Sequence, residues 1–144
     1  MEGIEHIKHC NKTLAIIIRT DFQKDGIEFF TPDVFSQQLA YMKRKKDYLI
    51  SPHIHNIVKR DIDITQEVLF SKSGIVRIDF YNDSELYLES RILNKGDVIL
   101  LANGGHGFKM IEESEIIEVK QGPYIGSLDK ERFASVLEKD VKIL

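Results

Sequence analysis

The stretch EVLFSKSGIVRIDFY, residues 67–81, decides the fold of this chain. Its first part is rich in apolar side chains, a turn-forming Gly74 follows, and apolar and polar residues then alternate from Ile75 to Phe80. Side chains of an extended strand point alternately to its two faces, so this alternation buries one face and exposes the other. The stretch therefore predicts two strands joined at Gly74 as a β-hairpin.

Similar short apolar segments lie on both sides of this hairpin, and turn residues separate them. The predicted strands are Leu14–Arg19, Tyr48–Pro52, Leu86–Leu93 and Val98–Leu101, with a second hairpin made by Phe108–Ile111 and Ile116–Val119. Short strands at this close spacing are typical of an all-β sandwich or barrel. Helical spacing occurs only at Lys130–Lys139, where we expect a short C-terminal helical segment.

Length and composition limit the classes of protein to which the chain can belong. Its 144 residues suit a single domain, 1–144, and its lone cysteine, Cys10, cannot form an internal disulfide. The apolar runs fall far short of the roughly twenty residues of a membrane-spanning helix, and the acidic N-terminus does not resemble a secretory signal. A net charge of −3 lacks the positive excess of nucleic-acid-binding modules. We therefore expect a cytoplasmic protein with neither membrane nor nucleic acid among its partners.

Three of the five histidines lie among the predicted strands, as the pair His53 and His55 and as His106 in a glycine-rich segment. On a shared strand, the period of two points both imidazoles of the pair to one face, where they could bind one ion. Glu67 could add a carboxylate oxygen, and His106 a third imidazole. Such a nitrogen and oxygen site suits zinc, iron, manganese, nickel or cobalt. The alternative is that the pair lies on the solvated face of a strand.

The segment around these residues resembles the first motif of the cupin family, G-x5-H-x-H-x3–4-E-x6-G. Asp47 stands at the first glycine position, five residues lead from it to His53 and His55, and six residues separate Glu67 from Gly74. The chain departs from the motif between His55 and Glu67, where eleven residues replace three or four. This insertion predicts a longer loop beside the site.

A later stretch resembles the second cupin motif, G-x5-P-x-G-x2-H-x3-N. Gly96 opens it, but Ala102 stands at the proline position and His106 comes one residue early. Met110 stands where the asparagine is expected. The joint presence of both motifs on β-rich sequence is nevertheless a specific signal.

Together the motifs cover about residues 35–120 and imply a small jelly-roll barrel, a double-stranded β-helix, with a divalent transition metal in its mouth. A shift of strand register by one residue would exchange Glu67 for Gln66 at the site, and the spacing to Gly74 favours Glu67. The metal ligands that the resemblance implies are His53, His55, Glu67 and His106.

Three residues near this site are candidates for binding substrate: Arg60, Gln66 and Tyr124. The planar guanidinium of Arg60, in the inserted loop, could hold a phosphate. Tyr124, which follows a Gly-Pro turn signal, could stack on a sugar or base over the barrel mouth. The alternatives are a solvated charge in a loop and a plain turn.

Residues 65–70, 104–108 and 118–124 are similar to those of small single-domain cupins from surface-polysaccharide and nucleotide-sugar gene clusters. The resemblance implies a metal-binding protein that acts on a small molecule, a sugar or sugar nucleotide, as an isomerase or epimerase. A metal would polarise a carbonyl or hydroxyl group, whereas a metal-free isomerase would use the histidines as proton carriers. An iron-dependent dioxygenase and a non-catalytic ligand-binding or sensor cupin are the alternatives.

Small jelly rolls leave sheet edges that need cover, which predicts a homodimer. The apolar run Leu14–Ile18 is the candidate strand for pairing across the two subunits.

Overall fold

The computed structural model describes all residues, 1–144, as ten β-strands and two 3₁₀ turns. The strands are β1 (Ile4–His9), β2 (Lys12–Ile18), β3 (Gly26–Phe29), β4 (Ala40–Lys43), β5 (Glu67–Ser73), β6 (Val76–Tyr81), β7 (Tyr87–Leu93), β8 (Val98–Leu101), β9 (Gly105–Met110) and β10 (Glu115–Lys120). The 3₁₀ turns are Gly126–Leu128 and Glu138–Asp140. The expectation of an all-β fold is confirmed. Neither helical turn has the length and apolar character that a bilayer crossing requires.

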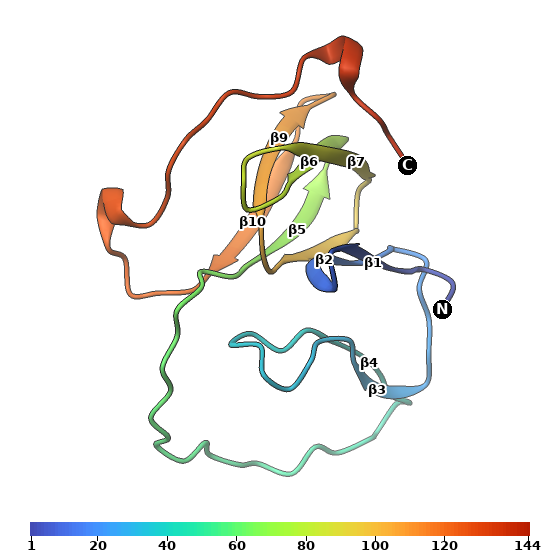
Figure 1. The fold of residues 1–144 in the computed structure, drawn as a ribbon. Helices are drawn as coiled ribbons and strands as arrows, with labels where there is room; N and C mark the ends of the chain where they lie inside the picture. The colour runs from blue at the N-terminus through green and yellow to red at the C-terminus, as the bar shows by residue number, and fades with distance from the viewer.

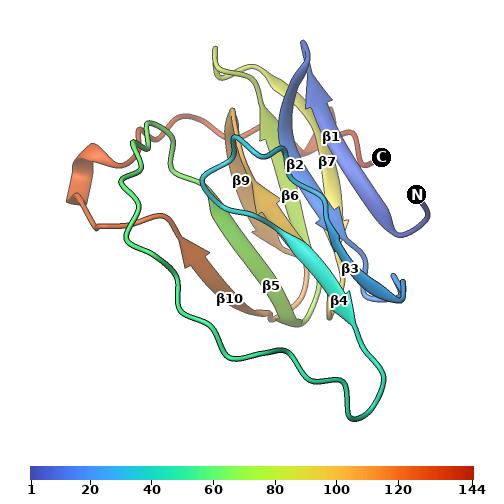
Figure 2. The same cartoon turned by 90° about the horizontal axis from the view of Figure 1, so that it is seen from below.

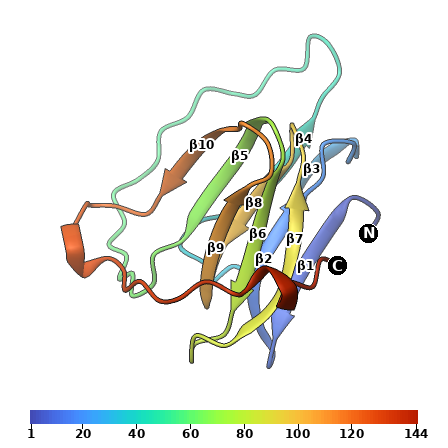
Figure 3. The same cartoon turned by 90° about the horizontal axis from the view of Figure 1, so that it is seen from above.

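The strands form two larger sheets and one separate pair, and every pairing between them is antiparallel. The first sheet has the order β1-β2-β8-β5-β10, the second has the order β7-β6-β9, and β3 pairs only with β4. Figures 2 and 3 show the two larger sheets facing each other. Several neighbouring strands in a sheet, such as β2 and β8, are not consecutive in the chain. The chain therefore crosses repeatedly between the two larger sheets.

The main hydrophobic core fills the space between the facing sheets. In β6, Val76, Ile78 and Phe80 point into it, and each is at most 1% exposed. Leu69 of β5 and Ile99 of β8 meet them from the first sheet. Burying a side chain of this size contributes about 1.5–3 kcal/mol, so the alternation that predicted β6 also supplies much of the stability of the sandwich.

Strand β2 is buried on both faces. Ala15 and Ile17 face the main core, whereas Ile16 and Ile18 face a second cluster that includes Phe22 and lies under the β3–β4 segment. A strand covered on both faces is apolar throughout, which explains why this run does not alternate. Strand β2 also pairs with β1 on one side and β8 on the other. The predicted pairing of this strand across two subunits is therefore wrong, because an interior strand has no free edge.

The deciding stretch 67–81 forms two strands as predicted, but they do not pair with each other. Strand β5 pairs with β8 and β10, and β6 pairs with β7 and β9. Gly74, at a φ of 79°, carries the chain from one sheet to the other, and a Cβ there would lie 2.3 Å from the carbonyl oxygen of Glu113. The predicted hairpin of β9 and β10 is also wrong, because β9 pairs with β6 and β10 pairs with β5. Alternation identifies extended residues, and the facing core decides which strands become neighbours.

The predicted helical segment at Lys130–Lys139 is absent, and only the short turn Glu138–Asp140 is helical. The aromatic ring of Phe133 packs edge-on against Tyr81, with ring centroids 5.0 Å apart. Val136 donates its backbone N–H to Tyr81 Oη at 2.9 Å. These contacts with the second sheet hold the segment extended, so tertiary packing overrides the helical spacing.

We call residues 121–135 the strap and residues 136–144 the tail. The tail runs beside β7, where Ser90 donates its N–H to the carbonyl of Lys142 and accepts from the N–H of Leu144. Figure 1 shows strap and tail passing outside the sheets before the chain ends near β7.

Residues 44–66, which we call the long loop, contain no strand. Figure 1 shows them as a wide arc away from the sheets. The predicted strand Tyr48–Pro52 falls within this loop and is wrong. Large apolar side chains of the loop are open to solvent, among them Ile54 at 90% and Ile57 at 105% exposure.

Candidate functional site

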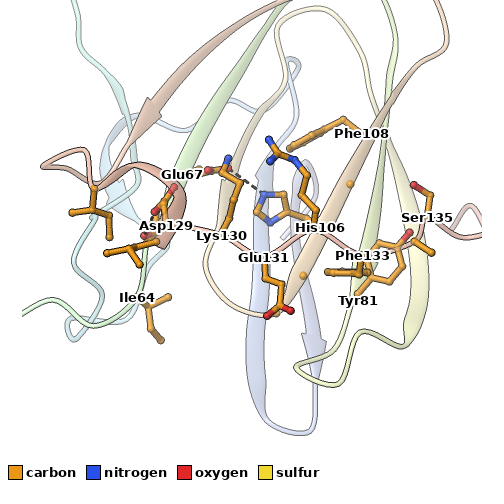
Figure 4. A pocket seen from close by; sticks show the side chains of 18 of the residues that line it. Ile64, Glu67, Tyr81, His106, Phe108, Asp129, Lys130, Glu131, Phe133 and Ser135 are labelled. Atoms are coloured by element: carbon orange, nitrogen blue, oxygen red, sulfur yellow. Dashed lines mark hydrogen bonds and ion pairs between the residues drawn. The ribbon is translucent and has the colours of Figure 1, made fainter.

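A pocket of about 700 Å³ lies at one end of the facing sheets (Figure 4). One wall consists of the last residues of the long loop with Glu67, and another is the beginning of β9 around His106. Residues 125 and 128–135 of the strap form the third wall, and Tyr81 at the end of β6 completes the lining. Three segments that are distant in sequence therefore meet here.

Glu67 and His106 meet inside this pocket because both point into the space between the sheets. Glu67 lies two residues before the core residue Leu69 on β5, so the two side chains share a face. His106 is the register partner of the core residue Phe80, which places its ring on the same inward side from the opposite sheet. The Nε2 of His106 lies 3.2 Å from Oε2 of Glu67.

The charges around Glu67 keep its carboxylate ionised. The hydrogen bond from His106 lowers the pKa of Glu67, and the positive charges of Lys130 and Lys120 lower it further, although burial opposes them. Glu67 is only 6% exposed. An ionised carboxylate only accepts hydrogen bonds, so His106 Nε2 is the donor and Nδ1 of a neutral ring remains a proton acceptor.

Contacts on either side of residues 130–132 attach the strap to the pocket walls. Before them, Asp129 accepts a hydrogen bond from Thr65 Oγ1 at 2.9 Å and one from Lys120 Nζ at 3.2 Å. After them, Phe133 packs so close to Gly105 that a Cβ at that position would lie 2.8 Å from the ring. Glycine at this position therefore permits the strap to lie against β9.

His53 and His55 are not brought to this pocket. Both lie exposed in the long loop, with their rings 5.2 Å apart and His53 Nδ1 3.0 Å from the carbonyl oxygen of Ser51. No group of three or more histidine, cysteine, aspartate or glutamate side chains converges anywhere in the structure. Two of the four expected ligands, Glu67 and His106, thus meet, and the donor set does not fit a metal in this arrangement of the loop.

The three candidate substrate residues also lie apart from the pocket lining. The Arg60 guanidinium is exposed and donates to the carbonyl of Val58 within the loop. Tyr124 is 85% exposed. Gln66 is buried, and its side-chain oxygen accepts hydrogen bonds from the Ser36 hydroxyl and from the N–H of Gln37. These bonds give Gln66 a structural role.

The strap residues of the pocket were not predicted from the sequence. Lys130 and Arg132 line the pocket although they lie more than sixty residues beyond Glu67 in the chain. No local motif marks them, and helical spacing suggested a different structure for them. The only signal was their position beside Phe133, an aromatic residue in a charged segment.

Neither models of known protein families, nor curated proteins, nor solved structures give a match to this chain.

Proposed function

We propose that this protein is a cupin-like jelly roll that binds a small molecule, a sugar or sugar nucleotide, in the pocket of Glu67 and His106. The observation that carries the proposal is the hydrogen-bonded pair that these two residues form between facing sheets. A buried carboxylate that fixes an imidazole in an open pocket is a recurring arrangement of acid–base sites. The two residues also occupy the glutamate and second-motif histidine positions of the cupin resemblance.

Their geometry favours isomerisation or epimerisation by proton transfer. Glu67 orients the His106 ring through Nε2, which leaves Nδ1 to accept and return a proton. Moving a proton between neighbouring carbons of a keto sugar needs one group that can accept the proton from one carbon and donate it to the other. A histidine is suited to this because its ordinary pKa lies near neutral pH.

A metal-binding form is the second candidate, and a feature of the long loop supports it. The loop ends at the pocket, where Asp63, Ile64 and Thr65 form part of the wall. Its apolar side chains lack cover, and β9 has a free edge beside His106. If the loop closes there, His53 and His55 join Glu67 and His106 as ligands. A bound divalent ion would act as a Lewis acid or, as iron, would serve a dioxygenase.

A homodimer remains part of the proposal. Because β2 is interior, the contact would use the free outer edge of β1 or of β10. Sedimentation at micromolar concentration should give twice the 16.6 kDa chain mass, and a monomer would contradict the dimer.

The pocket is tested by titrating a panel of sugar nucleotides into the wild type, His106→Ala and the control His9→Ala, which alters a histidine outside the pocket. We expect at least one compound to bind the wild type and the control equally and His106→Ala at least about tenfold more weakly. No binding by the wild type, or equal binding by all three, would overturn the proposal. A sensor would bind the compound without converting it, whereas an isomerase would convert it.

Elemental analysis of untagged protein separates the two candidates. The metal-binding form predicts about one transition-metal ion per chain, which is lost both in His106→Ala and in a His53→Ala/His55→Ala variant. Binding of the sugar nucleotide by metal-free protein, unchanged in the His53→Ala/His55→Ala variant, would instead support the Glu67–His106 pair acting alone.

A further inference from the structure

The strap places two cations over the Glu67–His106 pair. Lys130 and Arg132 both line the pocket, and Figure 4 shows Lys130 reaching toward Glu67. Side chains two residues apart in an extended segment point to the same side, so Arg132 faces the pocket as Lys130 does. Glu131 between them points away from the pair in Figure 4.

Neither Lys130 nor Arg132 forms a hydrogen bond or a close ion pair with another residue, although the charge of Lys130 acts on Glu67 from a longer distance. Of the four acidic residues that line the pocket, Glu67 accepts from His106 and Asp129 accepts from Lys120 and Thr65, whereas Asp63 and Glu131 pair with neither cation. Because Glu131 points away from the pair in Figure 4, the positive charge of Lys130 and Arg132 on this wall is available to an anionic ligand.

The attachments of the strap hold the two cations in place. Asp129 is bound to Thr65 and Lys120 directly before Lys130, and Phe133 packs on Tyr81 directly after Arg132. A segment ordered in advance loses less conformational entropy when a ligand binds. Lys130 and Arg132 lie between two attachments to the pocket walls. Arg60 differs from them because its guanidinium bonds only to the Val58 carbonyl within the long loop.

We propose that Lys130 and Arg132 form an anion subsite that binds the phosphate or diphosphate group of the small ligand of this pocket. The inference rests on the proposed function and specifies the chemistry of its ligand. Arg132 can hold two phosphate oxygens through its planar guanidinium, and Lys130 supplies a point charge. The sugar part of such a ligand then extends toward His106.

The subsite is tested with inorganic pyrophosphate as the probe, by isothermal titration at low ionic strength. We expect the wild type and the control Lys139→Ala to bind it alike, because Lys139 is an exposed tail residue outside the pocket lining. A Lys130→Ala/Arg132→Ala variant should bind at least about tenfold more weakly, since hydrogen bonds from charged groups to phosphate are lost. Wild-type binding should weaken as salt rises.

Two results would overturn the subsite: absence of pyrophosphate binding by the wild type, or equal binding by wild type and double variant. Thermal unfolding of each variant establishes that it is folded. Failure of this inference is separate from failure of the proposed function, because the sugar-nucleotide panel on His106→Ala reports on the pocket itself. If that panel responds to His106→Ala and not to the strap variant, the pocket stands and the anion subsite does not.

Discussion

The strap with its tail and the long loop are of similar length and neither contains a strand, yet they differ in how the protein holds them. Residues 121–144 are attached to both sheets by hydrogen bonds and ion pairs. Every hydrogen bond and ion pair of residues 45–64 stays within the loop itself. The lack of strands therefore does not by itself make a segment loosely held.

The difference arises from where each segment finds partners. The tail meets Arg77 and Asp79, a buried ion pair on the outer face of β6 with hydrogen bonds of 2.8 and 3.0 Å. Glu138 contacts Arg77 Nη1 at 2.9 Å and so gives this guanidinium a second carboxylate. Residues 45–64 of the long loop have no such anchor, and large apolar side chains among them, such as Ile54 and Ile57, face solvent. Charged residues buried in a sheet can thus order a distant coil segment.

The largest expected effect comes from breaking the anchor of the tail. Arg77→Met leaves Asp79 buried without its cation, which should lower the free energy of unfolding by about 3–5 kcal/mol. Urea unfolding measures the change. In the long loop, Lys59→Met removes an ion pair whose side chains are both more than 85% exposed, and it should change stability by less than about 0.5 kcal/mol.

A second variant separates loss of the ion pair from general damage. Replacing both partners, Arg77→Met with Asp79→Leu, should recover most of the stability, because no charge remains buried. Equal instability of the single and double variants would contradict this account of the anchor.

A smaller effect is expected when acid weakens the contact between tail and sheet. Hydrogen bonds from Arg77 and Lys109 lower the pKa of Glu138 from 4.5 to about 2. Since the folded-state pKa is the lower one, Glu138 stabilises the fold fully above pH 4.5 and loses this contribution as the pH falls toward 2. The protection factors of the Val136 and Leu144 amides, which correct exchange for the intrinsic rate at each pH, should fall over that interval. In Glu138→Gln these protection factors should already be lower at neutral pH, and equal pH dependence in the two proteins would count against the contact.

The smallest effect is expected in the long loop. Ile57 is fully exposed, so Ile57→Ser should change the free energy of unfolding by less than about 0.5 kcal/mol. The matched core variant Ile78→Ala should cost about 2–5 kcal/mol. A loss of more than about 1.5 kcal/mol in Ile57→Ser would show that the loop packs against the protein in solution, and the contrast with the strap would then disappear.

The strands that the sequence predicted well carry a clear local pattern, either alternation or an unbroken apolar run. Strand β6 alternates in sequence, although all six of its residues are buried, and β8 coincides with the predicted apolar run Val98–Leu101. The N-terminal strand β1 was not predicted, because His6, Lys8 and His9 interrupt its apolar residues. It forms because β2 offers it a register of antiparallel hydrogen bonds.

Motif spacing in the sequence also identified two of the four candidate metal ligands that the structure brings together. Glu67 and His106 were singled out from motif spacing, and the structure brings them within hydrogen-bonding distance. The spacing of His53 and His55 required a strand that the long loop does not form. A period of two determines which side chains share a face only where the backbone is held extended by a neighbour.

The sequence by itself determined that the chain is all-β, which residues form most of its strands, and that a glutamate and a histidine from separate strands could share a site. Only the tertiary structure decided that β5 and β6 belong to different sheets, that the tail is extended, and that Lys130 and Arg132 border the same pocket. The physical reason is the separation in sequence over which each interaction acts. Alternation and turn residues act between near neighbours in the chain, whereas sheet partners and pocket walls depend on contacts between segments that come together only when the core is buried.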